Sequence, residues 1–590
     1  MSIAESTLNE VASGSRCLRV CSCLLFPLYE SDASEHACPV TTSREGGWRS
    51  ESPRASDRSR VWSMASPWKR WFNIALSSNQ KSLTSSLRQR RASVSVKFPI
   101  RRKFISITLL ALCSCTGRTP ASSHEPDPLI AKAENSLGGR VHVVGEPVDA
   151  WSLSERMSFY KVPGVSIAVL VNGRIAWAKG YGVLEAGKQT PVDVDTIFQA
   201  ASISKPVAAI VALRLVEQGA LSLDAPINDY LKSWKIPENE FTQRKPVTLR
   251  QIMSHSAGLT VSGFPGYAAD QPLPTIVQIL DGVAPANTPP IRVDKLPGES
   301  WRYSGGGYMV MQLAINDASG RSFSDLAHEF VLAPAGMARS AFTQPLSVAD
   351  STNAAVAHRG DGTPLPGHSH TYPELTAAGL WTTPSDLLRL AIAIIGAAKH
   401  EHGAMLGPEL TREMLTVQAD SYGLGLNLAD AGDGQVFWHG GSNVGFQSEL
   451  FAYSDGHGGA AIMTNGSGGY ELANEIKVSI AAAYGWKYGA AEERNAVTLT
   501  NERAAQYVGV YVAKMPPEAG RPDMSITVSA EGNTLWAKMG TGAPKLRLYV
   551  ASDTQVFFRV SPIFKVEADA NGRPTSIELA PGLLAVRQTE

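Results

Sequence analysis

The stretch from residue 201 to 219 is the sequence feature that most limits the possible folds. Its residues are apolar on nearly every face of a helix, and the stretch ends at a glycine, which commonly terminates helices. A helix that is apolar all round must be enclosed by other elements. The sequence therefore predicts a large domain built around this helix, and a length of 590 residues predicts about two to four structural units.

Strand patterns lie on both sides of a helical middle section. A β-hairpin with a type I′ turn is predicted where Asn172-Gly173 separates the strand-like runs 165–171 and 174–178. Helical patterns continue to about residue 415. They are followed by three strands and a helix, at 435–438, 446–453, 460–464 and 472–484. This order predicts an α/β domain over 141–490 whose sheet pairs the two ends of the domain.

The C-terminal part of the sequence has strand-like patterns in place of helical ones. Helical signals stop after Glu493, and short strand-like runs recur at 507–512, 525–529, 534–538, 546–551, 555–560 and 576–579. A run of short strands separated by turns is typical of a small antiparallel barrel. We therefore expect a separate β-domain over 495–590, without an evident catalytic group.

The N-terminal part has the features of an export signal in an unusual place. Residues 1–95 show no periodicity, and we expect them to be disordered or to lie upstream of the true translation start, near Val94 or Val96. Residues 96–115 have the charged-then-apolar order of a signal; a buried helix is the alternative. Leu112-Cys-Ser-Cys115 is similar to a lipoprotein processing site, which predicts lipidation of Cys115, and 101–105 resembles a twin-arginine signal. We expect an exported protein, periplasmic or tethered by lipid to a bacterial membrane, with a linker over 116–140.

Charge and cysteine content exclude several classes of function. Lys plus Arg and Asp plus Glu both number 54, so no net field favours nucleic acid. All cysteines lie at or before Cys115, which excludes a disulfide, a cysteine nucleophile and a cysteine zinc site in the main body. The histidine pairs at 368/370 and 400/402 lack further ligands. We expect no metal and no cofactor.

Ser202 and Lys205 stand at the start of the predicted buried helix. Three residues apart on a helix, their side chains share one face and can touch. Burial and the helix dipole both disfavour an ammonium, so the pKa of Lys205 should fall until its amine can take the proton of Ser202. The alternative is a helix-capping serine beside a surface lysine, and the spacing alone does not decide, because Ser78-Asn-Gln-Lys81 also matches it.

Two other segments supply partners for this pair. Tyr303 lies in a glycine-rich turn before an apolar helix, where it can form one acid/base unit with Lys205 or simply pack. Residues 437–446 read as a strand in which Gly440 and Gly441 allow a close approach of substrate. An oxyanion hole needs two backbone donors, which we assign to Ser202 and Ser442. A lone histidine such as His439 is more often a core residue than a catalytic one.

Taken together, these segments resemble the motifs of the serine β-lactamase and penicillin-binding superfamily, in its class C and esterase branch. Ser202 and Lys205 match Ser-x-x-Lys, Tyr303 matches the first residue of Tyr-x-Asn, and His439-Gly440-Gly441 takes the place of Lys-Thr-Gly. The resemblance covers about 145–490 and includes the landmarks 252–259, 377–386 and 463–465, where His255 is treated as structural. It implies an α/β sandwich: an antiparallel sheet flanked by helices, with a mostly helical second lobe and an appended β-domain.

The resemblance implies a hydrolase that forms an acyl intermediate on Ser202. Gly305 stands where β-lactamases carry asparagine, and His439 replaces a lysine that helps to bind a substrate carboxylate; with an ordinary pKa near 6.5, His439 should be mostly neutral at pH 7.5. Carboxylic esters or small amides are therefore favoured over β-lactams and D-amino-acid peptides. A non-catalytic cell-wall sensor is a further alternative, but it needs no buried lysine. The oligomeric state stays open, and no Gly-x-Ser-x-Gly elbow supports an α/β-hydrolase.

Overall fold

A computed structural model describes residues 127–590, except 516–522, 541–543, 561–562, 581 and 589–590. The expectations for residues 1–126, including the export signal and lipidation of Cys115, lie outside the described residues. The expected linker over 116–140 contains a helix, α1 (Pro128–Asn135), which is capped by the Asp127 side chain. Among the described residues, no helix is both long enough and apolar enough to span a bilayer.

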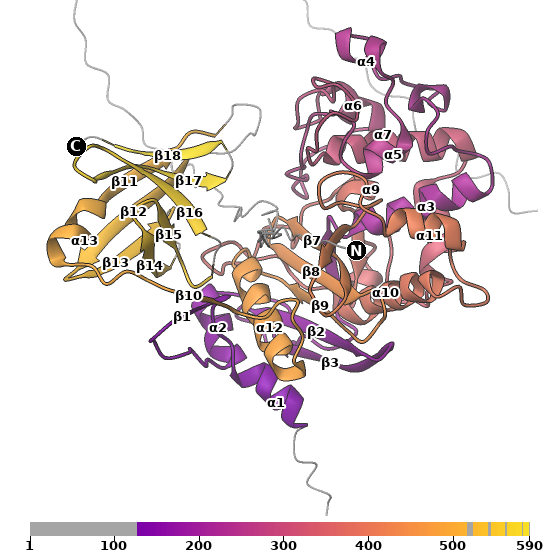
Figure 1. Ribbon diagram of the computed structural model, residues 1–590. Coiled ribbons are helices and arrows are strands. Elements are labelled where there is room, and N and C mark those ends of the chain that lie inside the picture. The colour runs from indigo at the N-terminus through magenta and orange to yellow at the C-terminus, as the bar shows by residue number, and fades with distance from the viewer. Residues whose placement is uncertain (1–126, 516–522, 541–543, 561–562, 581, 589–590) are drawn as a thin grey trace, which may run out of the picture. The chain divides into compact units, whose positions relative to one another are not determined.

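The main sheet has six antiparallel strands and joins the two ends of the domain, as predicted (Figure 1). At one end of the sheet the predicted hairpin is confirmed: Asn172 and Gly173 both have positive φ, 50° and 75°, as a type I′ turn requires. In spatial order the strands are β3 (Arg174–Gly182), β2 (Gly164–Val171), β9 (Gly458–Thr464), β8 (Phe446–Tyr453), β7 (Gln435–Asn443) and β6 (Asn427–Asp430).

Strand β2 is buried on both faces of this sheet, which explains why it is a nearly continuous apolar run. Val165, Ile167 and Val169 pack into a cluster with residues of α1, α2 (Leu153–Tyr160) and α12 (Gly469–Tyr484). The alternate residues Ala168 and Leu170 join the larger cluster that contains α3 (Ser204–Glu217) and α10 (Pro384–Ala398). Successive strand side chains point to opposite faces, so the two clusters form two separate layers.

Helix α3 is the predicted buried helix, and it lies at the centre of the larger core. Eleven of its 14 residues are buried, Lys205 among them. Its neighbours form the mostly helical lobe (Figure 1). A small sheet of β4 (Phe198–Ala201) and β5 (Leu380–Thr382) lies in the same core. The other α-helices of this lobe are α4 (Glu240–Arg244), α5 (Leu249–Met253), α6 (Ile276–Asp281), α7 (Gly305–Ser319), α8 (Phe323–Ala327), α9 (Leu375–Ala378) and α11 (Pro408–Met414).

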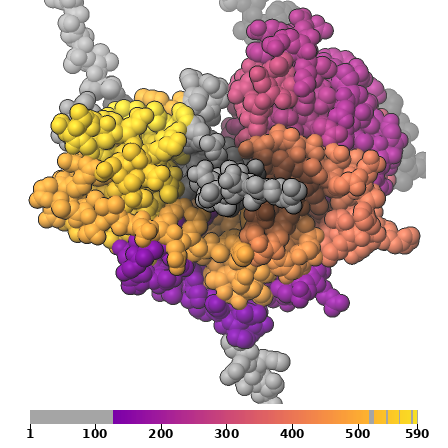
Figure 2. All heavy atoms as spheres, viewed as in Figure 1, coloured from indigo at the N-terminus to yellow at the C-terminus, as the bar shows by residue number. Residues whose placement is uncertain are grey.

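The C-terminal region is a closed barrel of eight antiparallel strands, as its strand pattern predicted. Figure 2 shows the side chains of the later barrel strands, in yellow, as one packed surface. Its strands are β11 (Gly509–Ala513), β12 (Met524–Glu531), β13 (Thr534–Met539), β14 (Lys545–Ser552), β15 (Gln555–Phe557), β16 (Ile563–Ala568), β17 (Pro574–Ala580) and β18 (Leu583–Arg587).

The expectation that helical signals stop after Glu493 is wrong. Helix α13 (Asn501–Tyr507) begins at the cap Thr500 and buries Ala504 and Tyr507 in the barrel core. Seven residues are too few to establish a helical period in sequence. Residues 141–143, at the start of the predicted α/β domain, form strand β1 (Val141–Val143), which pairs in parallel with β10 (Glu492–Arg494).

Candidate active site

Ser202 lies on a sharp turn between strand β4 and helix α3. Ala201, the residue before it, has a φ of 50°, a left-handed conformation that costs a non-glycine residue about 1–3 kcal/mol. The Ser204 side chain braces the turn: its hydroxyl donates to the Ala201 carbonyl at 2.6 Å and accepts from the Leu380 amide at 3.0 Å. The turn leaves Ser202 only partly buried, whereas its neighbours on both sides are buried.

Lys205 contacts the hydroxyl of Ser202, as the spacing predicted. Its Nζ lies 3.0 Å from Ser202 Oγ and donates to the Ala377 carbonyl at 2.9 Å. The residue is 2 % exposed, and burial lowers the pKa of Lys205 from 10.5 to about 7. A large fraction of the lysine is therefore neutral near pH 7 and able to accept a proton from the serine.

Tyr303 lies beside this pair. Lys205 Nζ is 4.9 Å from the centre of the Tyr303 ring and 5.4 Å from that of Tyr308. Ser304 caps helix α7, because its hydroxyl accepts from the Gly307 amide at 2.9 Å, and this fixes the backbone next to Tyr303. The structure thus brings Ser202, Lys205 and Tyr303 into one place from two separate segments, the turn into α3 and the residues before α7.

Strand β7 runs past the nucleophile turn, and its two glycines differ in their surroundings. A Cβ on Gly441 would lie 2.1 Å from the carbonyl oxygen of Ala200, so glycine is needed for β7 to pack against β4. A Cβ on Gly440 would have no atom nearer than 3.6 Å. Ser442 is exposed and follows directly on the Gly441 contact, so its backbone lies near the turn that carries Ser202.

His439 is neutral at pH 7.5, as expected, but its pKa differs from expectation. Its Nδ1 is 2.6 Å from the Gly440 carbonyl, which can only accept, so Nδ1 carries the proton; Nε2, 2.9 Å from the Tyr422 hydroxyl, then accepts. Burial and the nearby charge of Lys205 lower the pKa of His439 to about 3. The expected ordinary pKa near 6.5 is therefore wrong. His439 is neutral throughout the working pH range, and both of its nitrogens are engaged.

Gly305 faces protein and not an open cleft. A Cβ at this position would meet Phe264 Cε2 at 3.0 Å and the Ser262 carbonyl oxygen at 3.1 Å. The Gly305 amide donates to that same carbonyl at 3.1 Å. The space that an asparagine side chain would take is thus filled by Phe264, which comes from a loop that the sequence pattern did not trace.

Sequence reasoning missed several groups around the site. Tyr422 contacts His439, and the Ala377 carbonyl accepts from Lys205, whereas Ser204 binds Ala201, the residue before the nucleophile. The glycines on either side of Leu424 mark a turn, but nothing in the sequence pairs Tyr422 with His439. His255, expected to be structural, lies with its ring centre 4.2 Å from that of Tyr303.

The chain is similar in sequence to known proteins over part of its length. The chain is 26 % identical over 235 residues to the protein Flp of Staphylococcus aureus, which covers 38 % of this chain and 42 % of Flp. It is 30 % identical over 146 residues to the mouse mitochondrial serine beta-lactamase-like protein LACTB, covering 24 % of each chain. The chain therefore spans less than half the length of these curated relatives.

Among solved structures, an octameric penicillin-binding protein homologue from Pyrococcus abyssi aligns with a TM-score of 0.49 and 20 % identity, over 74 % of this chain and 97 % of that one. The beta-lactamase family profile matches residues 152–484, which is more than half of the chain and includes every predicted site residue from Ser202 to Ser442. The chain therefore belongs to the beta-lactamase family, within the superfamily of serine β-lactamases and penicillin-binding proteins.

Proposed function

We propose that this protein hydrolyses carboxylic esters or small amides that lack a carboxylate, through an acyl intermediate on Ser202. The proposal rests on the contact between Lys205 Nζ and Ser202 Oγ, which is 3.0 Å long. The Lys205 side chain that makes this contact is buried. A pure binding module has no use for a buried lysine whose charge is disfavoured by its surroundings. Burial lowers the pKa of Lys205 to about 7, which suits a general base near neutral pH.

The proposed reaction has two halves. Neutral Lys205 takes the proton of Ser202 as Oγ attacks the substrate carbonyl, and the tetrahedral oxyanion accepts hydrogen bonds from the amides of Ser202 and Ser442. The unit of Lys205 and Tyr303 returns a proton to the leaving alcohol or amine. Water then attacks the acyl group, with the same unit as base, and Ser202 recovers its proton.

Two positions support a substrate without a carboxylate. His439 offers neither a positive charge nor a free N–H to an anion, because Gly440 and Tyr422 occupy its nitrogens. Phe264 fills the space beside Gly305 and presents an apolar edge there, so an acylamide would lose a partner. Each polar substrate group left buried and unpaired would cost about 1–3 kcal/mol, or roughly 5- to 150-fold in specificity. An ester with an apolar leaving group meets neither cost.

The test compares the specificity constants for a nitrophenyl butyrate and a chromogenic cephalosporin at pH 7.5. The wild type should strongly favour the ester, and Ser202→Ala, the control for background hydrolysis, should turn over neither substrate. A wild type that favours the cephalosporin would contradict the proposed substrate class.

A triple variant examines the two positions directly. His439→Lys supplies the missing cation, and Gly305→Asn is combined with Phe264→Ala because the phenylalanine ring occupies the space that asparagine needs. Its preference should move toward the cephalosporin relative to that of Phe264→Ala alone. An unchanged preference would mean that these positions do not set the substrate class.

A further inference from the structure

His255 holds the backbone on both sides of Tyr303. The amide of Arg302, the residue before Tyr303, donates to the His255 carbonyl oxygen at 2.8 Å. The amide of Ser304, the residue after Tyr303, donates to His255 Nδ1 at 3.1 Å. The imidazole also lies against the phenol ring of Tyr303, with the ring centres 4.2 Å apart. One histidine therefore contacts Tyr303 through its ring and through both neighbouring peptide groups.

The arrangement requires a neutral imidazole. Nδ1 accepts the Ser304 N–H, so the proton of the ring sits on Nε2, for which the described residues provide no hydrogen-bond partner. Protonation of Nδ1 would break the bond to Ser304. Burial, with the nearby charge of Lys205, lowers the pKa of His255 well below 6.5 and so preserves the acceptor.

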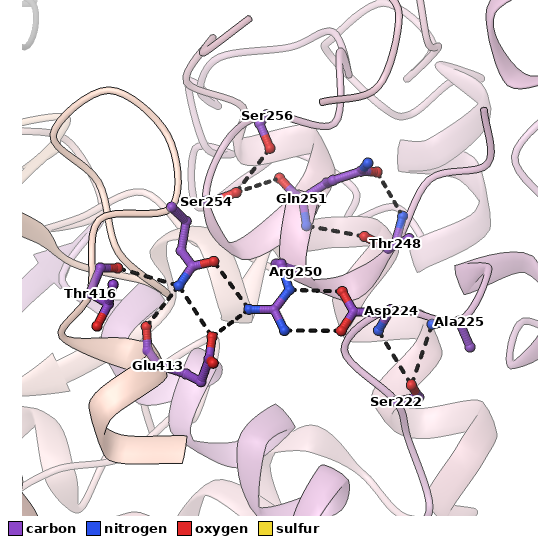
Figure 3. Close-up of polar contacts among 11 residues, drawn as sticks. Ser222, Asp224, Ala225, Thr248, Arg250, Gln251, Ser254, Ser256, Glu413 and Thr416 are labelled. Atoms are coloured by element: carbon purple, nitrogen blue, oxygen red, sulfur yellow. Dashed lines mark hydrogen bonds and ion pairs between the residues drawn. The ribbon is translucent and has the colours of Figure 1, made fainter. Parts of the chain in front are cut away.

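His255 follows directly on the C-cap of helix α5, and its amide donates to the Ile252 carbonyl at 3.2 Å. Figure 3 shows the polar contacts of the helix and of the serines that flank His255. Arg250 on this helix forms two bonds with Asp224, at 2.7 and 2.9 Å, and a third with Glu413 at 2.6 Å. Ser254 and Ser256 on either side of His255 join hydroxyls at 3.0 Å. The turn gives His255 a φ of 58°, a conformation that histidine and asparagine tolerate better than most residues.

We propose that His255 is a positioning residue, which clamps Tyr303 against Lys205 by accepting hydrogen bonds from the amides that flank the tyrosine. The inference rests on the proposed function, because it assigns a purpose to the position of Tyr303. It goes beyond a packing role: the ring alone would keep Tyr303 covered, whereas the Nδ1 acceptor fixes the direction in which the Tyr303 peptide, and with it the phenol, enters the site.

Two variants separate the acceptor from the ring. His255→Asn keeps a side-chain acceptor near the Nδ1 position and suits the positive φ, and His255→Phe keeps an aromatic ring but leaves the Ser304 amide unpaired. We expect His255→Asn to retain kcat for nitrophenyl butyrate within about threefold, because the acceptor is kept. His255→Phe should lose about 10- to 100-fold in kcat with KM changed less than about threefold, since the defect lies in positioning a reacting group.

A second readout does not depend on turnover. With 3-fluorotyrosine incorporated throughout, the fluorine resonance of Tyr303, identified by its loss in Tyr303→Phe, should keep its wild-type position and width in His255→Asn and change both in His255→Phe. Equal effects of the two variants, or no effect of His255→Phe on both kcat and the resonance, would overturn the clamp. If Ser202→Ala retained turnover, the proposed function would fall, and the fluorine resonance would still decide the clamp. Should His255→Phe not fold, a loss of the native resonance and of kcat in folded His255→Asn would contradict the proposal.

Discussion

The pH dependence of turnover follows from the burial of Lys205. A lysine with a pKa of about 7 is roughly 9 % neutral at pH 6 and roughly 91 % neutral at pH 8, whereas at its ordinary pKa of 10.5 it would be about 0.3 % neutral even at pH 8. Because only the neutral amine can take the proton of Ser202, kcat/KM for a neutral ester should rise about tenfold from pH 6 to 8 and then level off. The difference between the two pKa values corresponds to about 5 kcal/mol in favour of the neutral form.

The assay uses nitrophenyl butyrate, followed at a wavelength where the product absorbs equally in both ionisation states, with spontaneous hydrolysis subtracted. Lys205→Arg is the matched control, because a guanidinium keeps the positive charge but cannot lose its proton in this range. It should show no rising limb and almost no turnover. A wild-type rate that increases about a hundredfold from pH 6 to 8 and continues to rise, as an unshifted lysine would require, would refute the assignment. So would a rate that does not depend on pH.

Ser202→Ala and Lys205→Ala should each remove nearly all ester turnover. The double variant should be little slower than either single variant, because the effects on the rate of residues that act as one unit are not additive. Losses that multiply in steady-state kinetics would contradict this prediction. Glu374 is fully buried, neither of its carboxyl oxygens has a hydrogen-bond partner among the described residues, and burial raises its pKa from 4.5 to about 8. Between pH 4.5 and 8 the folded state therefore keeps a proton that the unfolded state has lost, so stability falls as pH rises through this window. Glu374→Gln should reduce the difference in free energy of unfolding between pH 5 and 8.5 by a few kcal/mol. An unchanged difference in urea titrations would show that the carboxyl does not titrate as described. The mature protein should begin at Cys115 and carry lipid on its sulfur, which mass spectrometry of the native protein can check; recovery of peptides from residues 1–90 would exclude this processing.

The sequence predicted those parts of the fold that are determined by residues close together in the chain. The Asn172-Gly173 turn and the apolar run of β2 were sufficient to place the hairpin, because the turn type and the burial of both faces follow from neighbouring residues. The contact between Ser202 and Lys205 was predicted from their spacing, although Ser202 lies in the turn before α3 and not on the helix itself. The barrel was predicted as a class, but two of its strands were missed: β16, in which only Phe564 and Val566 are buried, and β18, in which only Ala585 is buried. One or two buried residues give too weak an alternating pattern.

The site was predicted less completely, because its remaining contacts join segments that are far apart in the chain. The filling of the space beside Gly305 by Phe264 depends on the path of a loop. The low pKa of His439 depends on its burial beside Lys205 and is not set by the residue type. The hydrogen bond from the Ser304 amide to His255 could not be predicted from the sequence, because it joins two segments, 252–259 and the turn at Tyr303, whose packing against each other no local pattern indicates. In each case the tertiary contact changes the chemistry that the residue type alone would suggest.

The account depends most on the covalent intermediate at Ser202. Enzyme mixed with excess nitrophenyl butyrate and quenched in acid within the first turnovers should carry one butyryl group, located by peptide mass spectrometry on the segment that contains Ser202. Ser202→Ala should carry none, and Tyr303→Phe should accumulate the label more slowly, because its acid/base unit is impaired. A wild type that turns over the ester without any acyl group on Ser202, or that carries the group on another residue, would contradict the central claim.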